Sequence, residues 1–214
     1  GPGDVGMPKV GTAKRLVQSI TPAATCRPVI GDIVDEEHAR TIGGYDFTFL
    51  CTDSHASRAV VGQAAYQMLV PVIDMGVSIT VADGCISHIS GRVQMLSPGL
   101  PCLACTGALD GEQVRRELLT PEQRAADPYI IGGQAPQPAV ISINSAMASL
   151  ATTMFLGAVA GVPAEARFQR YDGIRGIVRP MAATIRENCI ICSQALAQGI
   201  EWGLPMRPKG GRHG

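Results

Sequence analysis

The stretch "YDFTFLCTDSHASRAVVGQAAYQMLVPVIDMG", residues 45–76, decides the fold class of this chain. It begins with "YDFTFLCTD", a short apolar run with aromatic and β-branched residues, which is typical of a buried strand. "SHASRAVVGQAAYQML" follows with helical character, and "VPVIDMG" is again a short apolar run. A strand, a helix and a second strand in this order predict parallel strands joined by a crossover helix.

The rest of the chain extends this pattern in both directions. We predict helices at 7–20, 35–42, near 110–120 and at 139–161, strands at 24–33, 166–173 and 176–186, and a long loop over 120–138. "VSITVADGCISHISGRVQML" alternates and contains Asp83-Gly84, a hairpin signal that favours antiparallel strands. The prediction is an α/β fold with a Rossmann-like, doubly wound, mostly parallel sheet and an antiparallel C-terminal portion. Residues 1–201 would form one domain, and 202–214 a flexible tail.

Composition restricts the possible partners. The 214 residues carry 18 Lys and Arg against 18 Asp and Glu, and only 4% are aromatic. A balanced charge argues against nucleic acid or an anionic membrane as the main partner, and few aromatics argue against base stacking. The apolar helix predicted at 139–161 is expected to be buried rather than to span a membrane. With no signal-peptide pattern at the start, we expect a soluble cytoplasmic protein.

Four of the seven cysteines form two C-x-x-C pairs. The first pair, Cys102 and Cys105, lies in a turn rich in Pro and Gly, and the second pair, Cys189 and Cys192, follows the last predicted strand. Four thiolates in two close pairs are typical of a tetrahedral structural zinc site. A thiol–disulfide function needs only one such pair and is the alternative.

Several motifs in this order resemble the MoeB/ThiF/HesA superfamily, the adenylating enzymes related to ubiquitin-activating enzymes. They are "DVGMPKVGTAKRLVQSITP", "YDFTFLCTDSHASR", "VPVIDMGVSI", "GRVQMLSPGLPCLACTG", "PQPAVISIN" and "ENCIIC". The resemblance covers residues 4–192, and its most specific part is the paired C-x-x-C together with the "TD" at a strand end.

The resemblance implies Mg-ATP-dependent adenylation of the C-terminal carboxylate of a ubiquitin-like or sulfur-carrier protein, with release of pyrophosphate. It implies that Lys9 contacts ATP phosphates, that Asp53 binds Mg2+, and that the four paired cysteines bind zinc. It also implies a homodimer.

Elementary chemistry leaves alternatives open for the acidic and basic residues. Asp53 follows a buried strand, at the edge where open α/β sheets bind ligands, which favours the metal role; the alternative is that it caps the next helix. Lys9 could be a solvated helix charge. Asp74 ends the next predicted strand and could hold a metal through water, orient a substrate, or cap a turn through "DMG". Arg58 could pair with Asp53 or with Asp74.

The chain also departs from the family pattern. A Gly-rich ATP loop of the type G-x-G-G-x-G is expected ahead of the first helix, and this sequence has none. Residues 106–188 contain no cysteine, so a thioester relay from that region is not expected. Ser54 stands where the family often has Asn.

Three functions follow from these observations. The first is the zinc-bearing portion of a ThiF-like adenylating enzyme. The second is a catalytically inactive relative that serves as a binding or dimerisation module. The third, an NAD(P)-dependent oxidoreductase, requires the Gly-rich turn and leaves the paired thiols unexplained.

Overall fold

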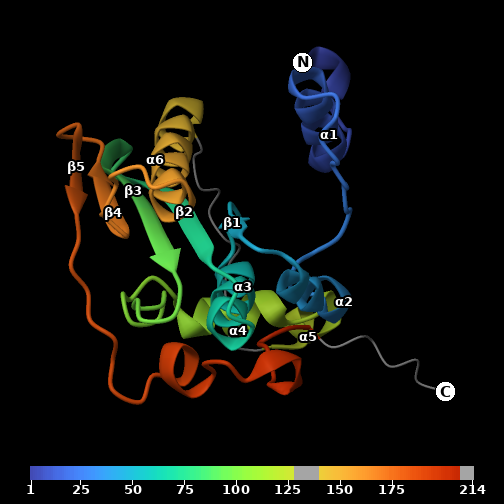
Figure 1. The fold of residues 1–214 in the computed structure, drawn as a ribbon, viewed down its shortest axis with the longest axis vertical. Helices are drawn as coiled ribbons and strands as arrows, with labels where there is room; N and C mark the ends of the chain where they lie inside the picture. The colour runs from blue at the N-terminus through green and yellow to red at the C-terminus, as the bar shows by residue number, and fades with distance from the viewer. Residues whose placement is uncertain (128–139, 208–214) are drawn as a thin grey trace. The chain divides into compact units, whose positions relative to one another are not determined.

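The computed structural model describes residues 1–127 and 140–207 (Figure 1). These residues divide into two compact units, 1–32 and 33–214. Each unit is described by itself, and the single domain expected over 1–201 stays a prediction.

The first unit contains one regular helix. A short turn, η1 (Pro2–Asp4), precedes α1 (Lys9–Ile20), which has Pro8 as its N-cap residue. Pro suits a helix start because its φ is already helical and it has no N–H to leave unpaired. The strand predicted at 24–33 does not form, and its apolar residues Val29 and Ile30 are exposed. Apolar β-branched residues make a strand only where a neighbouring strand supplies hydrogen bonds, and the described residues supply none there.

The second unit is built on a five-stranded sheet. Its strands lie in chain order, β1 (Thr48–Leu50), β2 (Val72–Ala82), β3 (Cys85–Leu96), β4 (Phe168–Asp172) and β5 (Ile177–Pro180), as Figure 1 shows. β1 pairs with β2 in parallel, whereas the β2–β3, β3–β4 and β4–β5 pairs are antiparallel. The α/β class is confirmed, but the prediction of a mostly parallel sheet is wrong for the described residues.

The antiparallel half is set by the turn between β2 and β3. Asp83 and Gly84 form this turn with φ angles of 53° and 75°. Two consecutive residues with positive φ are typical of the tight hairpin turn that "DG" predicts. "VIDMG" and "VSITVA" therefore form one long strand rather than two elements, because no turn interrupts them at Asp74.

Helices cover both faces of the sheet, as predicted. On one face lies α3 (His55–Gln67), which is buried along most of its length against Val72 and Leu96. The same cluster includes Ala39 of α2 (Glu36–Ala39) and Ile42 of the following turn, η2 (Arg40–Gly44). Two further helices, α4 (Gly111–Leu118) and α5 (Pro121–Ala126), follow the first cysteine pair. α5 occupies part of the predicted loop, and the remainder of that loop, 128–139, lies outside the described residues.

The opposite face of the sheet is covered by α6 (Ile141–Val159). Its buried residues are Met147, Ala151 and Met154, which pack against Ile73 and Val93. The prediction that this helix is buried is wrong, because a helix on one face of a sheet buries only one stripe. By length and composition it is the one helix in the described part of the chain that could cross a membrane. Its spacing of buried residues fits a helix that packs on a sheet.

Gly91 on β3 is required by the close packing of α6. A Cβ atom at this position would overlap the side chain of Met147. We expect Gly91→Ala to destabilise the protein by about 1–3 kcal/mol, the usual cost of overpacking a core. Urea unfolding of the variant measures this. Gly111→Ala is the control, since open space surrounds Gly111. Equal stability of the two variants would contradict this account of the packing.

The C-terminal segment packs on α3. Gln67 donates from Nε2 to the carbonyls of Gly199 and Trp202, and Gln63 donates to that of Gly203. Leu204 is buried, and the backbone N–H of Arg207 donates to Val34 O at 2.7 Å. Residues 203–207 therefore pack within the second unit. The remainder of the predicted flexible tail, 208–214, lies outside the described residues.

Candidate functional site

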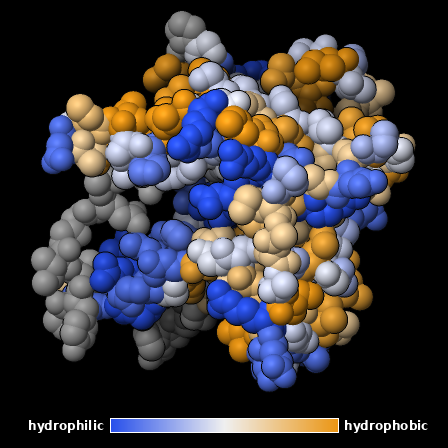
Figure 2. All heavy atoms as spheres, turned by 90° about the vertical axis from the view of Figure 1, so that its left-hand side faces the viewer, coloured by the Kyte–Doolittle hydropathy of each residue, from blue (hydrophilic) through white to orange (hydrophobic). Residues whose placement is uncertain are grey.

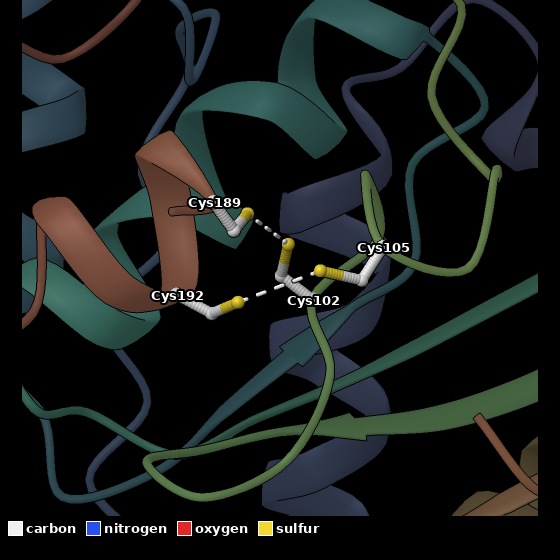
Figure 3. A group of neighbouring side chains, drawn as sticks. All are labelled: Cys102, Cys105, Cys189 and Cys192. Carbon is white, nitrogen blue, oxygen red and sulfur yellow. Dashed lines mark hydrogen bonds between the residues drawn. The ribbon is translucent and has the colours of Figure 1, made fainter. Parts of the chain in front are cut away.

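The two C-x-x-C pairs come together in the second unit. The Sγ atoms of Cys102 and Cys189 are 3.6 Å apart, and so are those of Cys105 and Cys192 (Figure 3). All four Sγ atoms lie within 4.8 Å of one another. A tetrahedral ion with metal–sulfur bonds of about 2.3 Å requires sulfurs about 3.8 Å apart. The four cysteines are thus placed to hold one metal ion, and their donor set fits zinc.

Each pair is presented by a tight turn. After Cys102, the backbone N–H of Thr106 donates to Cys102 O and that of Gly107 to Ala104 O, which folds the chain back over the first pair. At the second pair, Cys189 begins a short helical turn, η3 (Ile190–Gln194), and its carbonyl accepts from Ser193 and Gln194. Local backbone hydrogen bonds therefore hold both thiols of each pair on one side of a turn.

The thiol environments differ within the cluster, and the clearest difference lies between Cys189 and Cys192 of the second pair. Burial raises the pKa of Cys102 well above its usual value, and it raises the pKa of Cys192 to about 11. Burial also acts on Cys189, but hydrogen bonds from the backbone of Cys192 and Ile191 outweigh it and bring the pKa of Cys189 to about 7. Two buried thiols that resist ionisation in the absence of a cation are consistent with a site whose ligands ionise when a metal binds.

Asp53 lies at the carboxyl end of β1, between the strand and α3, and its side chain is exposed. The cap of α3 is Ser54, whose Oγ accepts from the backbone N–H of Ser57 at 3.0 Å. The alternative in which Asp53 caps this helix is therefore wrong. The start of α3 receives a second acceptor from far along the chain, since Glu117 accepts from the backbone N–H of Ala56 at 2.7 Å.

Asp74 is fully buried in the middle of the sheet and contacts two arginines. Arg92 donates from Nε and Nη2 to Oδ2 of Asp74 at 3.0 and 2.6 Å. Arg58 of α3 lies on the other side, with Nε 3.3 Å from Oδ1. The turn through "DMG" that Asp74 could cap does not exist, because Asp74 and Gly76 both belong to β2. Its single negative charge is shared by two cations, and a role toward a cofactor stays a prediction.

Arg58 pairs with Asp74, one of its two predicted partners. The ion pair between Arg92 and Asp74 was not predicted from the sequence. A two-residue hairpin turn at 83–84 predicts that Asp74 faces Val93 across the strands. A bulge between Thr80 and Val81 shifts the register, so that Asp74 faces Gln94 and shares a face with Arg92. No local signal in the sequence marks that bulge.

Lys9 is the first residue of α1 and is exposed. It belongs to the first unit, whereas Asp53, Asp74 and the cysteines belong to the second. The contact between Lys9 and ATP phosphates stays a prediction.

Comparison with known proteins gives consistent results at three levels. The model of the ThiF family matches residues 1–191. The molybdopterin-synthase adenylyltransferases of Escherichia coli K12 and Salmonella typhimurium LT2 are each 27% identical over 192 residues, which cover 89% of this chain and 68% of theirs. The crystal structure of E. coli MccB with ATP has the same fold, with a TM-score of 0.62 and 12% identity, over 90% of this chain. The chain spans about half, 52%, of the MccB chain. From the extent of the family match, this chain belongs to the ThiF family.

Proposed function

We propose that this chain is the zinc-bearing portion of an adenylyltransferase that uses Mg-ATP to activate the C-terminal carboxylate of a ubiquitin-like or sulfur-carrier protein. Membership of the ThiF family and the names of the two curated relatives support the reaction type. The observation that carries the proposal is the position of Asp53. Its exposed carboxylate lies at the carboxyl end of the parallel strand β1, and the following helix, α3, does not use it as a cap.

The proposed reaction joins two anions. A carboxylate oxygen of the carrier protein attacks the α-phosphorus of ATP, a P–O bond forms, the bond to the bridging oxygen breaks, and pyrophosphate leaves with its electron pair. Mg2+, when bound, would neutralise the negative charge that develops on the phosphates. Asp53 offers the oxygen ligand for that ion, and Lys9 is proposed to add a positive charge beside the phosphates. The four cysteines have no part in the bond changes, and their role is to hold the C-terminal segment against the turn after β3.

Asp53→Asn tests the assignment. We expect this change to lower ATP–pyrophosphate exchange by about a hundredfold or more, a loss typical of removing one stabilising group from a transition state. Stability should stay unchanged, because Ser54 still caps α3. The measurement uses the full-length protein with its carrier at saturating Mg-ATP, and thermal melting serves as the control for folding.

Asp46→Asn is the matched control variant. Asp46 is also exposed and lies just before β1, at the end opposite to Asp53. Near-normal exchange by the Asp53 variant, or an equal loss in both variants, would refute the metal role of Asp53. If the unmodified full-length protein shows no exchange at all, the alternative of an inactive binding or dimerisation module replaces this proposal. The family resemblance also implies a homodimer, which light scattering of the same protein would test.

A further inference from the structure

A row of arginines crosses one face of the antiparallel half of the sheet. In register, Arg92 of β3 lies directly opposite Arg170 of β4, and Arg170 lies directly opposite Arg179 of β5. Directly opposed residues point to the same face of a sheet. The row begins beside Asp74, near the centre of the sheet, and ends on the edge strand β5. It lies on the same face of the sheet as α3, which packs near the Asp74 end of the row.

The inner end of the row is neutralised only in part. Asp74 is the carboxylate between Arg58 and Arg92, so two guanidinium groups share one negative charge. Both hydrogen bonds of Arg92 to Asp74 leave from Nε and Nη2, and Nη1 has no acceptor among the described residues. Gly76 makes room for this arrangement, because a Cβ atom there would lie 2.7 Å from Nη2 of Arg58. The inner end thus keeps an excess positive charge and free donors.

The two arginines at the outer end of the row have no ion-pair partner among the described residues. Arg170 and Arg179 are exposed, and neither has an ion pair with any residue that the structure describes. Like charges placed directly opposite each other on neighbouring strands are destabilising. An anion bound between them would remove that repulsion and would accept hydrogen bonds from both guanidinium groups.

Two cavities lie along this row and share Ser90 and Arg170 as lining residues. The inner cavity, of about 240 Å³, is lined by Arg58 and Arg92 together with Phe168. The outer cavity, of about 490 Å³, is lined by Arg179 and by apolar side chains that include Ile174, Ile177 and Met181. Its one lining carboxylate, Asp172, already pairs with Arg175 at 2.9 Å. Figure 2, which faces the β5 side of the molecule, shows hydrophilic and hydrophobic side chains adjoining one another on this surface.

We propose that this arginine row binds an acidic peptide segment of a partner protein. A carboxylate of the peptide would lie in the inner cavity against Arg92 and Arg170, and the chain would continue over the outer cavity, where Arg179 takes a second carboxylate and Ile174 contacts an apolar residue. Planar guanidinium groups suit carboxylates because they donate two parallel hydrogen bonds. Small-molecule sites usually have volumes of about 300–1,000 Å³. The inner cavity is smaller than this, so it fits a side chain better than a nucleotide. This inference is independent of the adenylation proposed above.

The test is direct binding to the full chain by fluorescence anisotropy. The probe is a fluorescein-labelled octapeptide of six glutamates and two leucines, and its partner probe has glutamine in place of every glutamate. We expect the glutamate peptide to bind and the glutamine peptide to bind at least tenfold more weakly. Arg170→Gln and Arg179→Gln should each weaken binding of the glutamate peptide about tenfold, as loss of a hydrogen bond to a charged group does. Added salt should weaken it further.

Three controls make the proposal falsifiable. Arg27→Gln removes the same charge from an exposed arginine in the first unit and should leave binding unchanged. Thermal melting of Arg170→Gln and Arg179→Gln should be equal to or above that of the unmodified protein, because each removes a like-charge contact. Equal binding of the two peptides, an equal effect of Arg27→Gln, or tighter binding of an octameric oligothymidylate than of the glutamate peptide would each overturn the proposal.

Discussion

Cys102→Ser is expected to abolish metal binding and to unfold the region around the two cysteine turns. The unmodified protein should contain about one zinc per chain, as a closed four-thiolate site requires. Because the two C-x-x-C pairs are far apart in sequence, a metal held by them would link the turn after β3 to the segment that packs on α3, and its binding energy would become folding energy. In zinc-finger peptides that energy is about 10–16 kcal/mol. We therefore expect the melting temperature to fall by more than about 10 °C, since each kcal/mol is worth about 2–4 °C at this size.

Metal analysis and thermal melting, with and without a chelator, measure this effect. Cys85→Ser is the matched control, because Cys85 is an exposed cysteine outside the cluster. The control should keep its metal and its melting temperature. A metal-free unmodified protein that melts normally, or a Cys102 variant that keeps a full equivalent of zinc, would disprove the structural zinc site.

Asp74→Asn is the second change with a large expected effect. Asparagine has nearly the same shape, but it removes the charge that neutralises Arg58 and Arg92, whose side chains are 13% and 21% exposed. Removing one partner of a buried ion pair leaves the other charges uncompensated and costs about 3–5 kcal/mol. We expect a loss of this size in urea unfolding. The pairing of Arg92 and Asp74 should also appear as a coupling energy in a double-mutant cycle with Arg92→Gln.

Asp83→Asn is the control for this change. Asp83 is exposed in the hairpin turn at positive φ, a conformation that asparagine also tolerates. Its stability should stay within about 0.5 kcal/mol of the unmodified protein. If Asp74→Asn is as stable as Asp83→Asn, Asp74 does not neutralise the two arginines in solution.

Local sequence signals predicted the elements that depend on a few neighbouring residues. Pro8 marks the start of α1, "TDS" precedes α3, and Asp83-Gly84 forms the hairpin turn. The presence of two C-x-x-C pairs also predicted that they lie close together in the fold, because one pair alone supplies half of the ligands of a tetrahedral site. Each of these features is fixed by backbone preferences or ligand chemistry within a short stretch of chain.

Features that depend on a partner element were predicted less well. The segment 24–33 has strand composition but no strand to pair with in the described residues, and α6 has the composition of a buried helix but meets the sheet along one stripe only. The share of parallel pairing was also overestimated: β1–β2 is the one parallel pair among the described residues, whereas the hairpin and the antiparallel C-terminal portion form as predicted. The composition of a segment indicates which secondary structure it can form. Whether it is buried or paired depends on the element that packs against it in the folded protein.

The sequence by itself determined the family, the strand–helix–strand unit, the hairpin and the grouping of the four paired cysteines. Only the tertiary structure decided which side chains meet across the sheet. The bulge between Thr80 and Val81 places Asp74 on the same face as Arg92, and the register of β4 and β5 then adds Arg170 and Arg179 to the row. The physical reason is the two-residue period of a strand: a shift of one residue moves every side chain to the other face, and no local signal fixes that shift.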